Sequence, residues 1–204
     1  PLDPKFALSD LKALVPAATG SEPLVVAVNR ASELRALIRL KADYGLNLVA
    51  LGAAEGHLVA RELAAAKIPV IINPMRNLPN QFEMLGATLA NARKLAEAGV
   101  IVTFYDPPSG SHNLRLLPQL AGNAAANGMP HEAALAAIMR NPAIIYGVAD
   151  RFGTIEPGKV ADIVLWNGDP LELASRPLAV FIDGRRTSLR NRQTLLRERY
   201  RDLS

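Results

Sequence analysis

The sequence predicts an α/β protein built on a parallel sheet. Three observations support this class: four short apolar runs recur along the first hundred residues, segments with helical spacing separate them, and the pattern becomes alternating after Gly147. Apolar runs that do not alternate are typical of strands buried on both faces. Alternating strands and helices are typical of parallel sheets with right-handed crossovers.

The four apolar runs define the predicted strands. They begin at intervals that fit either a TIM-type barrel or a doubly wound sheet, so the pattern alone leaves both open. Four units cannot close a barrel of eight, and we therefore expect exposed sheet edges or a partner that covers them. The predicted parallel strands are residues 24–28, 46–51, 69–72 and 100–104.

Helices are predicted between these strands. Ser32 is expected to cap the first, with Glu33 in its opening turn and Gly45 at its end. Apolar residues at helical spacing give each helix one buried stripe. The other predicted helices are residues 55–66, 82–98, 112–127, 131–139 and 189–200.

The stretch after Gly147 predicts a small β element with period two. Strands are expected at 150–157, 161–166 and 179–182, with turns at 156–159 and 183–184. We accordingly divide the chain into a partial barrel (1–146), a small β element (147–188) and a C-terminal helix (189–204).

Composition excludes several classes of protein. The chain has 204 residues, half of them hydrophobic, and no cysteine, which excludes disulfides, thiolate zinc sites and cysteine nucleophiles. No apolar run reaches the ~20 residues that a membrane-spanning helix needs. The net charge of +4 comes from arginines near the C-terminus, with few aromatics among them, which favours a solvated or acid-docking helix over nucleic-acid binding. Without an initiator Met, we expect part of a longer protein, in the periplasm or the cytoplasm.

Several segments of the last third resemble a known family. They are 141–143 (NPA), Gly147, 150–151 (DR), 153–166 (GTIEPGKVADIVLW), 168–171 (GDPL) and 180–184 (VFIDG). Together they resemble the C-terminal signature of the amidohydrolase superfamily, and most closely the imidazolonepropionase-like metal-dependent hydrolases. The resemblance begins near Pro23 and implies the C-terminal half of a TIM-type barrel, followed by strands of a small composite β domain.

The resemblance also implies a mono- or dinuclear metal site at the carboxyl ends of the barrel strands. Its ligands are a His-X-His pair on the first strand, a lysine or acid on the fourth, histidines on the fifth and sixth, and an aspartate on the eighth. The matching positions here carry Ala27 and Asn29, then Gly52, then Asp106. We therefore expect zinc in the complete protein, and weak metal binding or none in this chain.

Two residues are candidates for catalysis. Asp106 follows a buried strand, where barrel enzymes place catalytic groups, and it is also the candidate metal ligand. His112 lies in the same loop, where it could act as a ligand or as an acid and base. The alternatives are a turn aspartate before two prolines and an exposed loop histidine. His57 and His131 are interpreted as helix-surface and helix-start residues.

Four polar residues at strand ends are candidate substrate contacts: Asn29, Arg30, Asn73 and Arg76. On a barrel rim they would favour anionic or carbonyl groups. Each alone could equally well satisfy loop backbone groups, and their shared position is what favours a binding role.

Two functions follow from these observations. The first is part of a metal-dependent hydrolase that acts on C–N bonds other than peptide bonds, or on related bonds, and that is inactive as this chain alone. The alternative is a catalytically degenerate barrel relative that acts as a binding or interaction module. The expected partners are a small-molecule substrate and either the missing N-terminal half or a second copy, with no nucleic acid and no membrane.

Overall fold

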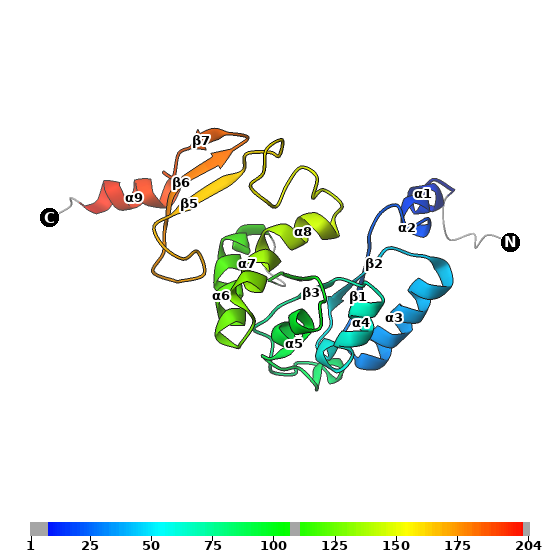
Figure 1. Ribbon diagram of the computed structural model, residues 1–204. Helices are drawn as coiled ribbons and strands as arrows, with labels where there is room; N and C mark the ends of the chain where they lie inside the picture. The colour runs from blue at the N-terminus through cyan, green and yellow to red at the C-terminus, as the bar shows by residue number, and fades with distance from the viewer. Residues whose placement is uncertain (1–7, 107–110, 202–204) are drawn as a thin grey trace.

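The computed structural model describes residues 8–106 and 111–201 (Figure 1). Two short helices, α1 (Leu8–Ala13) and α2 (Val15–Ala18), precede the main sheet. This sheet has the order β1-β2-β3-β4, and every neighbouring pair is parallel. The prediction of four parallel strands is therefore confirmed. The strands are β1 (Leu24–Val28), β2 (Leu48–Gly52), β3 (Val70–Ile72) and β4 (Val102–Phe104).

Three helices cover one face of the sheet (Figure 1). They are α3 (Ala31–Tyr44), α4 (Ala60–Ala65) and α5 (Asn91–Glu97). Two of them are shorter than predicted, because 3₁₀ turns, η1 (Gly56–Leu58) and η2 (Phe82–Met84), occupy the expected first turns.

The helix that follows β1 begins two residues earlier than predicted, because its N-cap is Arg30 and not Ser32. Ser32 lies inside its first turn and is exposed, so the expectation that Ser32 caps the helix is wrong. Glu33 caps it instead, since its carboxylate accepts hydrogen bonds from the backbone N–H groups of Asn29 (2.9 Å) and Arg30 (3.0 Å). A carboxylate in the first turn also interacts favourably with the helix dipole.

The main core lies between the sheet and these helices. Alternate strand residues such as Leu48, Val70 and Val102 are fully buried there against Leu34, Leu63 and Leu95 of the helices. Each such side chain stabilises the fold by about 1.5–3 kcal/mol relative to an exposed one. A smaller cluster covers the opposite face of the sheet and consists of Val49, Ile71 and Ile145, with Leu51, Ile101 and Tyr105 beside them.

Helices also follow the last strand of the sheet. They are η3 (Ser111–Leu116), α6 (Leu117–Ala126), α7 (His131–Ile138) and α8 (Arg140–Ile145). The last of these was not predicted. Met139, with φ −123° and ψ −78°, separates it from α7, and Pro142 lies in its first turn, where the missing N–H has no partner within the helix. None of the helices in the described part of the chain is both long and apolar enough to span a membrane.

A second sheet lies beyond α8 and is antiparallel, in the order β5-β6-β7. Its strands are β5 (Ile163–Trp166), β6 (Pro177–Ile182) and β7 (Arg185–Thr187). The predicted strand at 150–157 is wrong, because this stretch forms turns and bends. Gly153 adopts φ +94° there, and a Cβ at this position would lie 3.1 Å from the Arg140 Cα, so close packing against α8 replaces strand pairing.

The segment between β5 and β6 holds the second sheet against α6 and α7. Leu171 is buried in the main core, and its carbonyl lies so near Gly122 that a Cβ there would be 2.4 Å from the carbonyl oxygen. His131 at the start of α7 contacts Asp169, with 2.6 Å between Nε2 and Oδ2. The two sheets are thus joined by an apolar contact and a polar contact.

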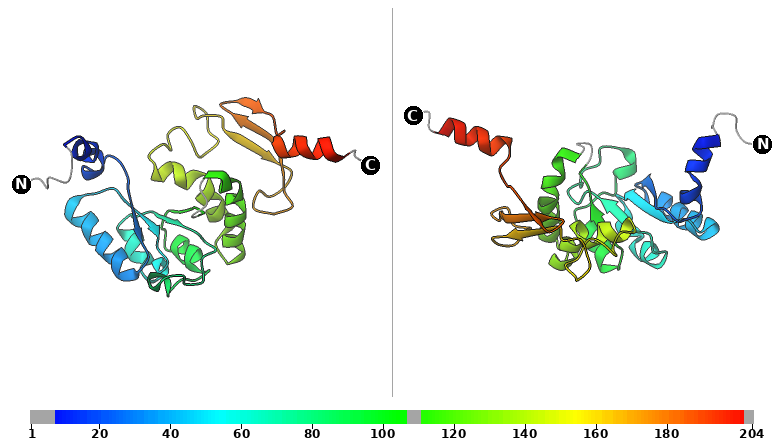
Figure 2. Two further views of the ribbon diagram at one scale, coloured as in Figure 1. Left: turned by 180° about the vertical axis from the view of Figure 1, so that it is seen from behind. Right: turned by 90° about the horizontal axis from the view of Figure 1, so that it is seen from above.

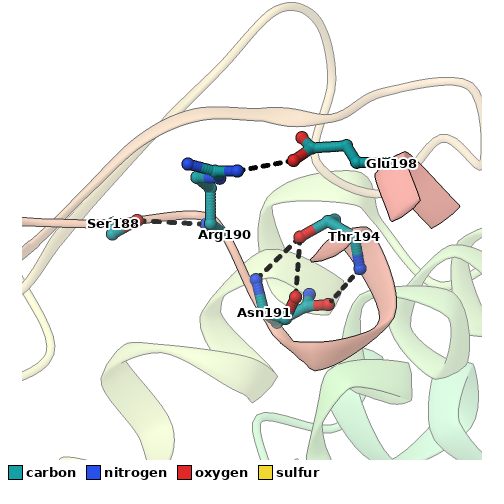
Figure 3. A network of polar contacts seen from close by, with 5 residues as sticks. All are labelled: Ser188, Arg190, Asn191, Thr194 and Glu198. Carbon is teal, nitrogen blue, oxygen red and sulfur yellow. Dashed lines mark hydrogen bonds and ion pairs between the residues drawn. The ribbon is translucent and has the colours of Figure 1, made fainter. Parts of the chain in front are cut away.

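The chain ends in a basic helix, α9 (Arg192–Arg201), which projects away from the second sheet (Figures 1 and 2). It has no buried residue. Local contacts define its start, since the Asn191 side chain accepts hydrogen bonds from the Gln193 and Thr194 N–H groups. Thr194 Oγ1 in turn accepts one from the Asn191 N–H, and Figure 3 shows the contacts between Asn191 and Thr194. Arg190, just before the helix, pairs with Glu198 inside it.

Candidate functional site

The carboxyl ends of the four strands lie along one rim of the sheet, where barrel proteins place their functional groups. Asn29, Asn73 and Tyr105 directly follow β1, β3 and β4, and Gly52 is the last residue of β2. They line a cavity of about 20 Å³, together with Ala54, Arg76, Met84 and Asn91. A water molecule needs about 10–15 Å³, so this cavity has room for one water and not for a substrate. A substrate would have to bind above the rim.

Asn73 connects the ends of β3 and β4. Its side-chain oxygen accepts a hydrogen bond from the Met75 N–H at 2.9 Å, which fixes the orientation of the amide. Its Nδ2 then points to Asp106 and donates to Oδ1 at 3.3 Å. The structure thereby brings together one predicted substrate contact and the predicted catalytic aspartate.

Tyr105 is a rim residue that the sequence analysis did not identify. It is half-buried, and this burial raises the pKa of its phenol above the ordinary value, while the positive charge of Arg76 acts in the opposite direction. The phenol is therefore protonated at neutral pH and can donate a hydrogen bond. Because side chains alternate along a strand, Tyr105 lies on the same face as Ile101 and Thr103. This alternation could have identified Tyr105 from the sequence as a rim residue.

A strained turn follows β2. Gly52 has φ +97° and Ala53 has φ +41°, a conformation that a residue with a side chain rarely adopts. Two hydrogen bonds hold Ala53 in place: its N–H donates to the Val28 carbonyl at 2.7 Å, and its carbonyl accepts from Asn91 Nδ2 at 2.9 Å. Asn91 is buried in α5, and its Oδ1 accepts the His57 N–H. The sequence could have identified Asn91, because it is a polar residue on the side of the helix that is otherwise apolar and buried.

The acidic residues beside the rim stabilise the start of α3. Hydrogen bonds from the Arg30 and Asn29 N–H groups lower the pKa of Glu33. Glu55 accepts the Ala31 N–H at 2.8 Å. The Arg30 side chain pairs with Glu83 at 3.5 Å on the surface. Of the four predicted substrate contacts, the structure thus groups Asn29, Asn73 and Arg76 around one cavity, while Arg30 is directed to an ion pair outside it.

The two histidines whose side chains are described, His57 and His131, lie in different parts of the fold. The His57 side chain lies beside α4 and α5, where burial and the charge of Lys94 lower its pKa, so it is neutral at pH 7. His131, at the start of α7, contacts Asp169 in the segment between β5 and β6. The backbone of His112 belongs to η3, and its side chain lies outside the described part of the chain.

The metal site that the resemblance implies does not fit the residues of this rim. Within residues 8–106 and 111–201, no three His, Cys, Asp or Glu side chains are close enough to hold a metal ion. The amide of Asn73 donates to Asp106, and the cavity beside it is lined by the amides of Asn29 and Asn91. A catalytic zinc ion commonly needs three protein ligands drawn from imidazole, thiolate and carboxylate groups.

Comparison with known proteins gives solved structures with the same fold. An amidohydrolase from Thermotoga maritima MSB8 is 32% identical and superimposes with a TM-score of 0.78, over 91% of this chain and 49% of that one. A prolidase complexed with N-methylphosphonate-L-proline is 16% identical, with a TM-score of 0.64 over 90% of this chain and 49% of that one. This second likeness shows the fold alone.

Relatives with curated descriptions match shorter stretches. Amidohydrolase tasK of Hapsidospora irregularis is 46% identical over 57 residues, which are 28% of this chain and 6% of that protein. Urease subunit alpha of Yersinia pestis (strain Pestoides F) is 34% identical over 113 residues, or 48% of this chain and 19% of that protein. The chain thus spans about half of the Thermotoga structure and less of these relatives. The model of the family described as "Amidohydrolase family" matches residues 28–187. The chain therefore belongs to the amidohydrolase family.

Proposed function

We propose that this chain is the C-terminal half of a TIM-type barrel, and that the complete protein hydrolyses C–N bonds other than peptide bonds, or related bonds. The observation that carries the proposal is the match to 49% of the Thermotoga amidohydrolase by a sheet of four parallel strands. Four strands are half of the eight that close such a barrel. On this proposal, residues 1–146 form the partial barrel, 147–188 belong to a composite β domain, and 189–204 form a C-terminal helix.

The rim residues then take distinct roles. Asp106 is the proposed catalytic carboxylate, and Asn73 is a positioning residue because it donates to Asp106 Oδ1. Asn29, Arg76 and Tyr105 offer N–H and O–H donors that suit a carbonyl or carboxylate group of a substrate. His112, which opens the helical segment after β4, is the second proposed catalytic residue. We propose Arg30 only as an outer contact, since it pairs with Glu83.

The chain alone is proposed to be inactive. The proposal is supported by the side chains at the rim, where the carboxylate of Asp106 accepts a hydrogen bond from the amide of Asn73 and the amide of Asn29 lines the adjacent cavity. We propose that zinc in the complete protein depends on ligands from the upstream half, since neutral amides are poor substitutes for imidazole or thiolate.

The test compares this chain with the same chain extended upstream to the start of its reading frame. Both are assayed against a panel of amides and ureas with added zinc. We expect no turnover by the chain alone and turnover by the extended protein, lost in Asp106→Asn and kept in the control Asp150→Asn, which changes an exposed aspartate after α8. Turnover by the chain alone would show that the proposal of an incomplete site is wrong.

A second function is favoured by the turn after β2. Gly52 occupies a position where the resemblance implies a histidine, and its conformation suits glycine. This supports a degenerate barrel relative that binds a small molecule without hydrolysing it. The two functions differ in one observable: an upstream His-X-His after a strand, with turnover by the extended protein, supports the hydrolase. Ligand binding without turnover supports the binding module.

A further inference from the structure

We infer that Asn29 and Gly52 form an interlocked pair that excludes any metal-ligating side chain from the end of β2. The inference rests on the proposed function only in placing the functional rim at the carboxyl ends of the strands. It concerns what this rim can hold, and it explains the poor fit of a metal site by the shape of the chain.

The first part of the argument is the backbone. At φ +97°, Gly52 lies in the region that favours glycine, so an L-residue there is strained whatever space it has. The turn cannot relax easily, since Ala53 donates to the Val28 carbonyl at 2.7 Å and Glu55 donates to the Asn29 carbonyl at 2.9 Å. The buried Asn91 amide holds the Ala53 carbonyl from the other side.

The second part is the space beside Gly52. A Cβ at this position would lie 2.7 Å from Asn29 Oδ1, 3.5 Å from Asn29 Cγ and 3.3 Å from the Val28 carbonyl oxygen. The first distance is far below ordinary contact, so the Asn29 side chain would have to move before even an alanine could fit. An imidazole requires more space still.

Asn29 can make room only by rotating its side chain. Its N–H donates to Glu33 at 2.9 Å, and its carbonyl accepts the Glu55 N–H at the same distance, so both sides of its backbone are fixed. Only side-chain rotation remains, and the adjacent cavity of about 20 Å³ has room for little more than one water. Asn29 and Gly52 therefore depend on each other: the missing side chain of one leaves room for the amide of the other.

The consequence is a rim that recognises ligands by hydrogen bonds. Amides at Asn29 and Asn73, the guanidinium of Arg76 and the phenol of Tyr105 are donors, and Asp106 is the one carboxylate among them. This set suits a carbonyl or carboxylate oxygen. It does not suit a divalent transition metal, which needs several charged or imidazole ligands.

The packing is tested by a double-mutant cycle on the 204-residue chain, measured as thermal melting temperature. Gly52→Ala, Asn29→Ala and the double variant are compared with Gly45→Ala. Gly45 is the matched control, because it also has a positive φ, of +67°, but its Cβ would meet nothing within 4 Å. We expect Gly52→Ala to lower the melting temperature by roughly twice as much as Gly45→Ala, and Asn29→Ala to remove most of the excess. Strictly additive effects would overturn the interlock.

Metal exclusion is tested with cobalt(II) alone as the probe, by visible absorption and by elemental analysis after dialysis. We expect no tetrahedral cobalt band in the parent chain and none in Gly52→His, whose melting temperature falls at least as far as that of Gly52→Ala. Cobalt that is bound by the parent chain and lost in Asp106→Asn would overturn the inference. So would a Gly52→His variant that gains tight cobalt binding with an unchanged melting temperature. These outcomes do not depend on turnover by the extended protein, so the inference and the proposed function can fail separately.

Discussion

The two edge strands of the main sheet differ in how they are covered. At β4 all three residues are buried, and the helices that follow provide polar contacts: Thr103 Oγ1 donates to the Ala137 carbonyl at 2.7 Å, and Asn141 Nδ2 donates to the Val102 carbonyl at 2.8 Å. At β1 three residues stay exposed, Leu24 by 37%, Val25 by 38%, and Ala27. Among the described residues, β1 pairs with β2 alone.

This difference shows which edge is more open to another strand in this chain. An open edge presents unpaired N–H and C=O groups and is a template for pairing with another chain. At β4 the Val102 carbonyl already has the Asn141 amide as its partner, and α7 lies beside the strand. We therefore propose that a second copy of this chain docks at β1, whereas closing a barrel with the upstream half would engage both edges.

Truncating one apolar residue on each edge strand gives the largest expected difference. Phe104→Ala removes a side chain that is 6% exposed in the main core, and we expect a loss of about 3–5 kcal/mol in the free energy of unfolding. Leu24→Ala, at 37% exposure, should cost less than about 1 kcal/mol. Urea unfolding measures both. Equal losses would mean that β1 is as well covered as β4.

Removing the amide at the covered edge should have a smaller effect. Asn141→Ala leaves the Val102 carbonyl without its side-chain donor, and we expect a loss of about 1–2 kcal/mol in the free energy of unfolding. The control is Asn123→Ala on α6, where an exposed amide donates to the Gln119 carbonyl and a change within about 0.5 kcal/mol is expected. Urea unfolding applies again, and matching values for the two variants would argue against a specific role for Asn141.

A charge on the open edge should weaken association. If chains pair through β1, Val25→Lys should raise the dissociation constant of the resulting dimer at least about tenfold, or roughly 1.4 kcal/mol. Leu40→Lys on α3 is the control, since Leu40 is 38% exposed and belongs to a helix. Sedimentation velocity across a range of concentrations gives the constants. A chain that stays monomeric at high concentration, or an equal effect of both lysines, would contradict docking at β1.

At acidic pH, the local stability of the β1 edge should fall before that of the β4 edge. Hydrogen bonds from the Arg30 and Asn29 N–H groups lower the pKa of Glu33 in the folded chain. The stability that Glu33 contributes is therefore present above its unfolded pKa, about 4.3, and is lost as the pH falls through the lower folded value. Amide hydrogen exchange between pH 6 and pH 3.5, corrected for intrinsic rates, should show protection falling in residues 24–34.

The covered edge provides the comparison in the same experiment. Neutral Thr103 and Asn141 make its polar contacts, so protection in residues 101–105 should change less over this range of pH. Replacing Glu33 with glutamine should make the response of residues 24–34 to pH flatter. If 24–34 and 101–105 lose protection together, global unfolding, and not the carboxylate of Glu33, is the cause.

The sequence by itself determined the strands of the main sheet and the rim they form. Runs such as residues 69–72 are apolar at every position, which is typical of a strand buried on both faces, and the order of strands and helices then favours a parallel sheet. Because all carboxyl ends of such a sheet share one rim, the positions of Asn29, Asn73 and Asp106 just after their strands are enough to place them along it. The predicted strand at 150–157 failed because local alternation does not reveal that Gly153 packs against α8.

The tertiary structure decided which side chains fit together at the rim. A glycine where the resemblance implies a histidine predicts that a metal ligand is missing, but it does not give a physical reason. The reason is a contact between residues on different strands, the 2.7 Å approach of Asn29 Oδ1 to the Cβ position of residue 52, together with a turn held by Asn91 from a helix far along the chain. The same holds for the two edges, since Asn141 reaches the Val102 carbonyl only after α7 has returned beside β4. Such contacts depend on distances between segments remote in sequence, and local patterns of residue type contain no information on those distances.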